Sequence, residues 1–268
     1  MAQTDYISQA KAYLRERLSA EISFQNNIEA LIEEYAYELV DIAYNANVPP
    51  NMFTFSYSKA IKENVDEVIG EMKQLIVSVT ETLAVGTHND NKKKILTYIG
   101  RDISGSNFYG RLDAHTDTFK KEMEGVIAAG LLIGALKTKV KQSIKANLHT
   151  PYQNPIFKEA VKSNLGTAEV LLKKGLHLGI GISNSAFNSI NTLGRFTIGD
   201  AWMYDGYLEM DAMGAIGYIG HRGSSFPCQE CDDQANRFHS LSEGMIYPLH
   251  PNCVCYIVTG KQIGRAHV

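Results

Sequence analysis

The chain has 268 residues, with 26 lysines and arginines against 29 aspartates and glutamates, giving a formal net charge of −3. A chain of this length can bury a sizeable core in one large or two smaller domains. Its near-neutral charge gives no overall argument for binding nucleic acid or an acidic membrane. The charged residues are nevertheless unevenly distributed, because acidic residues outnumber basic ones in residues 1–45, whereas residues 120–174 are rich in lysine.

Helical spacing dominates the first hundred residues. Residues 5–46 repeat apolar side chains three or four positions apart, which predicts one long amphipathic helix or two shorter ones. This stretch lacks the features of a signal peptide. Pro49 and Pro50 end it. The same spacing predicts helices over residues 58–83 and, after a turn at 86–91, over residues 92–103.

Residues 107–147 form the longest helical pattern and include an uncharged apolar run at 126–136. A bilayer span needs about 20 apolar residues, so we expect a buried central helix and no membrane partner. Gly130 and Gly134 would let another helix approach closely. The lysines that follow, up to residue 174, could contact DNA phosphates, although such a charge run is more often a solvated helix face.

Two prolines, Pro151 and Pro155, predict a boundary between a helical domain at 1–149 and a second domain at 150–262. Helices are expected over residues 156–164, 167–174 and 183–213. The glycines at 175–181 match neither a dinucleotide-binding loop nor a P-loop, so we interpret them as a connector.

Short strands are predicted over residues 215–220, 245–247 and 255–258. We therefore predict an α+β fold with a predominantly helical N-terminal part. A small C-terminal α+β module would follow, its short β-sheet closed by a zinc site.

All four cysteines lie near the C-terminus, as Cys228, Cys231, Cys253 and Cys255. A Cys-x-x-Cys pair and a second close pair of soft ligands can complete a tetrahedron around Zn²⁺, which makes a structural zinc ion the expected cofactor. His250 is a fifth candidate ligand, because it precedes Cys253 with the spacing of the first pair. Cys253 and Cys255 would instead share one face of a strand. The spacing leaves open which four residues bind.

Other interpretations of these residues are weaker. Disulfides are disfavoured because the chain has no secretory signal, while a metal-free buried cluster stays open as an alternative. Pro227-Cys-x-x-Cys is also half of the zinc-deaminase signature, which requires an upstream His-x-Glu or Cys-x-Glu that the chain lacks. His221 and His239 are expected to be exposed or hydrogen-bonded rather than ligands. We expect no catalytic site and predict that the protein is not an enzyme.

The Cys-x-x-Cys pair, Gly244 before a short apolar stretch, and the ending Pro248-Leu-His-Pro-Asn-Cys-x-Cys255 resemble the C-terminal core of the phage head morphogenesis family, the Mu F-like minor head proteins. The resemblance covers the last third of the chain, and His-Pro-x-Cys-x-Cys is its most specific part. Val254 stands where the family usually has arginine.

This resemblance implies a minor head (capsid) protein of a tailed bacteriophage, with a structural role in head morphogenesis at or near the portal. The implied partners are phage portal, scaffold or capsid proteins, with packaged phage DNA as a secondary expectation. The implied location is the virion, in the head interior or at the portal vertex, after assembly in the host cytoplasm. Two alternatives stay open: a zinc-stabilised nucleic-acid-binding module outside any virion, and an enzyme or toxin of unidentified chemistry.

The last six residues, 263–268, resemble one reading frame of a sequencing adapter. We exclude them from the fold prediction and expect the natural chain to continue differently beyond Gln262. His267 is therefore expected to carry no function.

Overall fold

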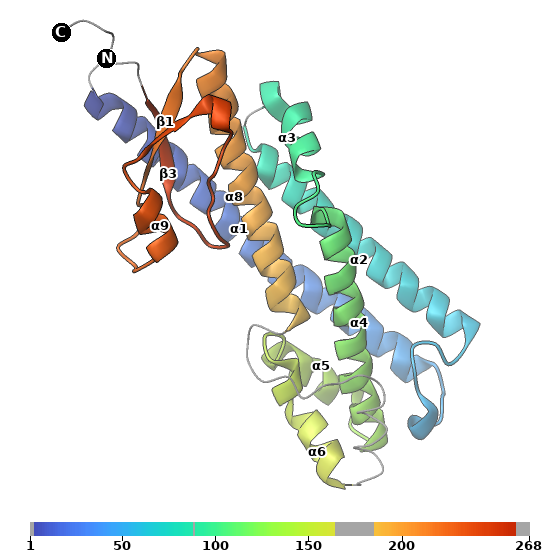
Figure 1. Ribbon diagram of the computed structural model, residues 1–268. Coiled ribbons are helices and arrows are strands. Elements are labelled where there is room, and N and C mark those ends of the chain that lie inside the picture. Colours follow the sequence, from blue (N-terminus) through green and yellow to red (C-terminus); the bar gives the residue numbers. More distant parts are fainter. Residues whose placement is uncertain (1–2, 88, 164–184, 261–268) are drawn as a thin grey trace, which may run out of the picture. The chain divides into compact units, whose positions relative to one another are not determined.

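The computed structural model describes residues 3–87, 89–163 and 185–260 (Figure 1). The predicted fold class is confirmed, since the described chain is mostly helical with a small antiparallel sheet near its C-terminal end. The elements in chain order are α1 (Gln3–Asn45), α2 (Lys59–Val85), α3 (Lys92–Ile99), α4 (Phe108–Leu132), α5 (Lys137–Ala146), α6 (Pro155–Ser163), α8 (Ala186–Ala212), β1 (Gly217–His221), α9 (Gln229–Gln234), β2 (Phe238–Ser240) and β3 (Tyr256–Gly260).

Two compact units make up the chain, and each is assembled from separate stretches of sequence. The first comprises Met1–Gln25, Ser78–Phe108 and Thr192–Val268, and the second comprises Asn26–Val77 and Tyr109–Asn191. Helices α1, α2 and α8 contribute residues to both units. The predicted boundary between residues 149 and 150 stays a prediction.

In the second unit, the first part of the predicted apolar run, residues 126–130 of α4, is buried as expected of a central helix, whereas Leu136 at its end is 74% exposed. Val126, Ile127, Ala128 and Ala129 are at most 2% exposed. Gly130 allows close packing there, because a Cβ atom on it would lie 2.6 Å from a methyl carbon of Val140 in α5. Within the part of the chain that the structure describes, no helix combines the length and the hydropathy needed to cross a membrane.

The predicted helical pattern over residues 107–147 is wrong in one respect, because it is divided into α4 and α5. Gly134 adopts a left-handed backbone conformation with φ of +65°. Its N–H donates to the carbonyl of Leu131 over 3.1 Å, and the N–H of Ala135 donates to the carbonyl of Gly130 over 2.8 Å. These two bonds form a Schellman motif, which ends a helix by satisfying its last carbonyls.

The sheet of the first unit is antiparallel with strand order β2-β1-β3. Strands β1 and β3 correspond to two of the predicted strands, but the third, predicted over residues 245–247, is wrong. That segment is irregular, since the N–H of Ile246 donates to the Tyr218 hydroxyl over 3.0 Å and Pro248 has no N–H to offer a ladder. Strand β2 forms earlier in the chain.

The side chains of β3 pack alternately against two helices. Tyr256 and Val258 form a buried cluster with Leu14 of α1, whereas Ile257 packs in a larger cluster that includes Met203 and Met210 of α8. This alternation follows from the two-residue period of a strand.

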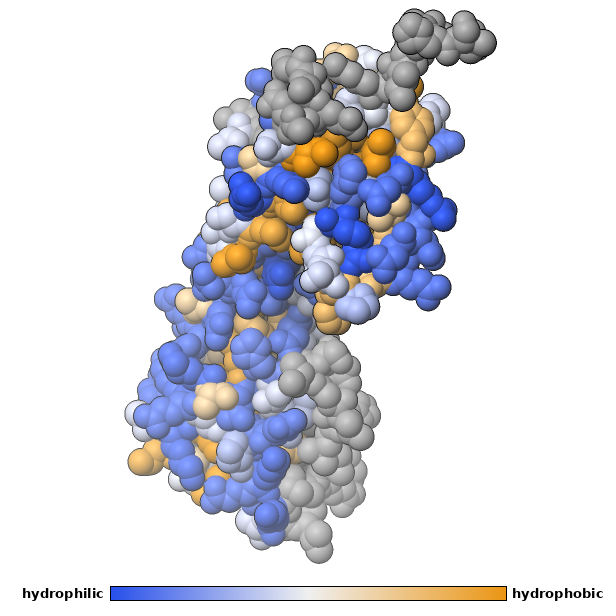
Figure 2. All heavy atoms as spheres, turned by 90° about the vertical axis from the view of Figure 1, so that its left-hand side faces the viewer, coloured by the Kyte–Doolittle hydropathy of each residue, from blue (hydrophilic) through white to orange (hydrophobic). Residues whose placement is uncertain are grey.

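We define residues 217–260 as the C-terminal module. On the face of the molecule that Figure 2 draws, apolar side chains gather into patches among hydrophilic ones.

Three other predicted segments have different outcomes. The helix predicted over residues 92–103 is shorter than expected, because α3 ends at Ile99 and Gly100 follows as its C-cap. The helix predicted over residues 167–174 and the glycine-containing connector at 175–181 lie outside the described residues.

Candidate metal centre

The topology of the sheet brings all five candidate ligands to one place. In the antiparallel pair β1 and β3, His221 at the end of β1 lies opposite Tyr256 at the start of β3. Cys228 and Cys231 follow β1 after a short loop, and residues 250–255 lead directly into β3. The two halves of the motif therefore meet at the same end of the sheet.

The first cysteine pair is positioned by α9. Cys228 is the N-cap residue of this short helix, and Cys231 lies buried in its first turn. The preceding loop is tied to the helix by Arg222, whose guanidinium donates to the carboxylate of Asp232 and to the carbonyl oxygens of Phe226 and Cys228. Both thiols consequently face the loop of residues 250–255.

The second half of the motif is shaped by a tight turn. The N–H of Cys253 donates to the carbonyl of His250 over 3.1 Å, and Asn252 between them has a left-handed φ of +63°. Proline at the second position and asparagine at the third are residues that type II turns favour. The Pro251-Asn252 sequence therefore places the side chains of His250 and Cys253 close to the first cysteine pair.

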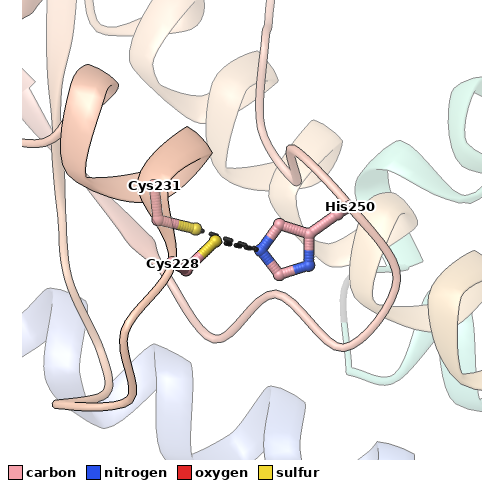
Figure 3. A group of neighbouring side chains, drawn as sticks. All are labelled: Cys228, Cys231 and His250. Atoms are coloured by element: carbon pink, nitrogen blue, oxygen red, sulfur yellow. Dashed lines mark hydrogen bonds between the residues drawn. The ribbon is translucent and has the colours of Figure 1, made fainter.

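Figure 3 shows that the side chains of Cys228, Cys231 and His250 point toward one another. The Nε2 atom of His250 lies 3.2 Å from the sulfur of Cys228 and 3.1 Å from that of Cys231, and the sulfurs of Cys231 and Cys253 are 3.9 Å apart. With Zn–S bonds of about 2.3 Å, two thiolates on a tetrahedral zinc ion are separated by about 3.8 Å. The cluster could hold a metal ion.

These donors form two overlapping groups that share Cys231. Cys228, Cys231 and His250 make the first group, and Cys231, Cys253 and Cys255 make the second, with the donor atoms of each group within 4.8 Å of one another. Five donors exceed by one the four that a tetrahedral ion takes. All five predicted site residues are thus brought together.

His250 has the hydrogen bond expected of a metal-binding histidine. Its Nδ1 atom lies 2.8 Å from the carbonyl oxygen of Pro251, which can only accept, so Nδ1 carries the proton. In the neutral ring, Nε2 then presents its lone pair to Cys228 and Cys231. A backbone carbonyl that orients the ring in this way is one of the common partners of a histidine bound to metal, beside carboxylates and water.

No family model, curated protein or solved structure matches the chain. The relation to phage head proteins therefore stays a prediction drawn from the residues of the motif.

Without metal, the thiols perturb one another strongly. Hydrogen bonds from the thiol of Cys255 and from backbone N–H groups lower the pKa of Cys253 to about 5. Donating that bond raises the pKa of Cys255, and burial raises the pKa of Cys231 to about 12. The hydrogen bond to Pro251 raises the pKa of His250. A bound cation would remove this competition for protons among neighbouring donors, because it binds the cysteines as thiolates and the histidine as the neutral ring.

The cysteines also belong to the core of the C-terminal module. Cys231, Cys253 and Cys255 are buried in the cluster that contains Tyr218 and Tyr247, and all four cysteines are free thiols. Of the other histidines considered, His221 stacks on Tyr256 and His239 on Tyr218, and neither joins the metal-ligand groups found among the described residues.

Sequence analysis missed one residue that touches this centre. Arg17 of α1 is 1% exposed, and its guanidinium donates to the carbonyl of Cys253 over 3.0 Å and to that of Cys255 over 3.2 Å. A signal was present in the sequence, because Arg17 and Glu21 occupy the helical stripe that also carries Leu14 and Phe24. A charged pair at core-facing positions is uncommon and needs a buried partner.

Proposed function

We propose that this protein is a minor head protein of a tailed bacteriophage, with a structural role in head morphogenesis at or near the portal, and that its C-terminal module is held together by a structural zinc ion. The observation that carries the proposal is the convergence of Cys228, Cys231, His250, Cys253 and Cys255 at one end of the sheet. These residues are the ones on which the resemblance to Mu F-like head proteins rests.

The chemistry of the donors supports a structural role and favours zinc. Thiolates and imidazole in a tetrahedral arrangement suit Zn²⁺ better than hard cations, which prefer carboxylates and carbonyls. Four protein ligands would fill the coordination sphere, whereas a catalytic zinc ion keeps one position for water. The ion would stabilise a three-stranded sheet whose own core is small, since metal binding adds directly to the free energy of folding.

Elemental analysis of the full chain, purified from a reducing cytosol, tests the zinc centre. We expect about one zinc per chain in the wild type and a large loss of both zinc and thermal stability in the double variant Cys228→Ser/Cys231→Ser, which leaves only three of the five donors. Gln229→Ser is the matched control, because Gln229 is exposed beside Cys228 and is expected to leave zinc content unchanged. A folded wild-type chain without metal would overturn the zinc centre.

Contact with packaged DNA is a secondary part of the proposal, carried by the lysine-rich stretch. In the second unit these lysines lie close to carboxylates: Lys137 and Lys141 to Asp41 at 3.1 and 2.8 Å, Lys139 to Glu159 at 3.4 Å, and Lys145 to Glu33 at 2.9 Å. DNA phosphates would compete with these acidic groups. Retention on duplex DNA at low salt that weakens as salt rises would support the contact.

Assembly is the direct test of the head role. Where portal, scaffold and capsid genes are found beside its own gene, the chain would be co-expressed with them and the particles separated by sedimentation. We expect the wild-type chain to sediment with portal-containing particles and the double variant Cys228→Ser/Cys231→Ser to be depleted from them. A gene without such neighbours, or particles that exclude a folded and metal-loaded chain, would contradict the proposal.

A further inference from the structure

Arg17 is a buried charge whose position needs an explanation. Removing a guanidinium from water costs several kcal/mol unless its charge and its donors are compensated. Its Nε atom lies 3.4 Å from a carboxylate oxygen of Glu21, without the geometry of a hydrogen bond. The directed hydrogen bonds of the guanidinium go to the carbonyl groups of Cys253 and Cys255.

The hydrogen bonds to these two carbonyls fix the backbone of the loop of residues 250–255, which carries three of the candidate ligands. The carbonyl of Cys253 belongs to the peptide group before Val254 and that of Cys255 to the peptide group before Tyr256, so a planar guanidinium that binds both fixes the backbone on the C-terminal side of each cysteine. Packing around the loop is close, since a Cβ atom on Gly223 would overlap the carbonyl oxygen of Val254 and approach Leu14 to 3.2 Å. The orientation of the Cys253 and Cys255 thiols is thereby linked to the position of α1.

The charges around the centre also favour this arrangement. Any four of the five donors would give an occupied zinc centre a net negative charge, of one with His250 and three thiolates or of two with four thiolates. The carboxylate of Glu21 lies 3.4 Å from the guanidinium of Arg17 and 3.7 Å from that of Arg195, so the net charge of the three side chains is positive whether or not Glu21 is ionised. This positive charge would partly offset the negative charge of an occupied centre, which lowers the cost of burying Arg17 beside it.

We infer that Arg17 is a positioning residue of the metal centre, and that metal binding is coupled to docking of the α1 segment around Leu14, Arg17 and Glu21 on the C-terminal module. This inference rests on the proposed zinc centre. Release of the ion would free the loop of residues 250–255 and remove the fixed acceptors of Arg17. By thermodynamic reciprocity, docking of α1 must strengthen metal binding by the same factor by which metal strengthens docking.

Metal affinity of the full chain tests the first half of this inference. Competition with a chromophoric chelator would be measured for wild type, Arg17→Met and Arg17→Lys, with Co²⁺ spectra reporting the ligand geometry. We expect about 10- to 100-fold weaker binding and an altered Co²⁺ spectrum in Arg17→Met. Arg17→Lys should recover only part of the affinity, because an ammonium keeps the charge but lacks the planar fork. Arg15→Met is the matched control, since Arg15 is exposed on the same helix.

Hydrogen exchange of the wild-type chain tests the second half and needs no variant. Metal removal should increase exchange in the peptide that covers Leu14 to Glu21 as well as in residues 250–255. Unchanged exchange in that part of α1, or Arg17→Met binding metal as tightly as Arg15→Met, would overturn the coupling while leaving the zinc centre intact. A wild-type chain that binds no metal would overturn the proposed centre itself and the coupling with it.

Discussion

Glu122 is a buried carboxylic acid in the second unit whose environment favours its protonated form. It is 2% exposed, accepts hydrogen bonds from the Tyr152 hydroxyl at 2.8 Å and from the N–H of Ala186 at 3.0 Å, and so helps to satisfy the start of α8. Burial raises its pKa from an ordinary value of 4.5 to about 7, because these two bonds only partly replace the lost hydration.

This shift predicts a pH dependence of stability. Between pH 4.5 and 7 the folded chain binds more protons at Glu122 than the unfolded chain, so its contribution is fully present below pH 4.5 and is lost as pH rises through 7. Glu122→Gln does not ionise. We therefore expect the free energy of unfolding of wild type, relative to this variant, to fall by about 2 to 3 kcal/mol from pH 5 to pH 8.

Urea unfolding of both proteins at several pH values measures the effect. Taking the difference between their free energies of unfolding cancels the contributions of the titratable groups that both proteins share. Parallel pH profiles for wild type and Glu122→Gln would contradict it. Glu122 could not have been singled out from the sequence, where it is one acidic residue in a helical pattern. Its burial depends on Tyr152 and Ala186, which are distant in the chain.

At the scale of elements, α4 and α5 pack closely because Gly130 has no side chain. Replacing it with alanine would place Cβ 2.6 Å from a methyl carbon of Val140 and 3.2 Å from the Tyr44 hydroxyl, which itself donates to the carbonyl of Ala135. We expect Gly130→Ala to lower the free energy of unfolding by about 1 to 3 kcal/mol, since the overlap outweighs the helix propensity gained.

Gly70 of α2 provides the matched control. A Cβ atom there would meet nothing within 4 Å, so Gly70→Ala should raise the free energy of unfolding by about 0.5 to 1 kcal/mol. Chemical denaturation of the two variants beside wild type checks both signs. Equal effects of the two substitutions would mean that close approach at Gly130 does not matter.

The prediction of secondary structure succeeded where the apolar periodicity was strong and failed where a local contact determined the backbone conformation. Helices α1 and α2 follow long apolar stripes and were predicted almost to their ends. The division of α4 from α5 depends on Gly134 taking a left-handed conformation, which its sequence permits but does not require. The segment at 245–247 has strand-like composition, yet its backbone bonds the Tyr218 hydroxyl instead of a neighbouring strand.

At the scale of the whole molecule, the C-terminal module depends on residues far away in the chain. Leu14 of α1 packs against β3 of this module, and Arg17 binds the carbonyl groups of Cys253 and Cys255. The α8 helix that packs on it is bound in turn by Tyr13, whose hydroxyl donates to the carbonyl of Trp202 over 2.5 Å, and by the bond from the Trp202 indole to the carbonyl of Leu83 over 2.8 Å.

A fragment of residues 150–262 would lack these contacts. We expect it to expose apolar surface to a hydrophobic dye, to unfold with low cooperativity and to bind zinc more weakly than the full chain. A peptide of residues 1–25 added in trans should restore part of the affinity. Cooperative unfolding of the fragment with the affinity of the full chain would contradict this expectation and would support the predicted domain boundary between residues 149 and 150.

The sequence by itself determined the helical character of the chain, the α+β class and the five candidate metal ligands. Periodicity and ligand spacing are local properties, and both survive in a single sequence. Only the tertiary structure decided that both halves of the motif meet at one end of the sheet, and that Arg17 is buried against the carbonyls of Cys253 and Cys255. The two contacts of Arg17 join residues that are 236 and 238 positions apart in the sequence, and no local pattern encodes a pairing over that distance.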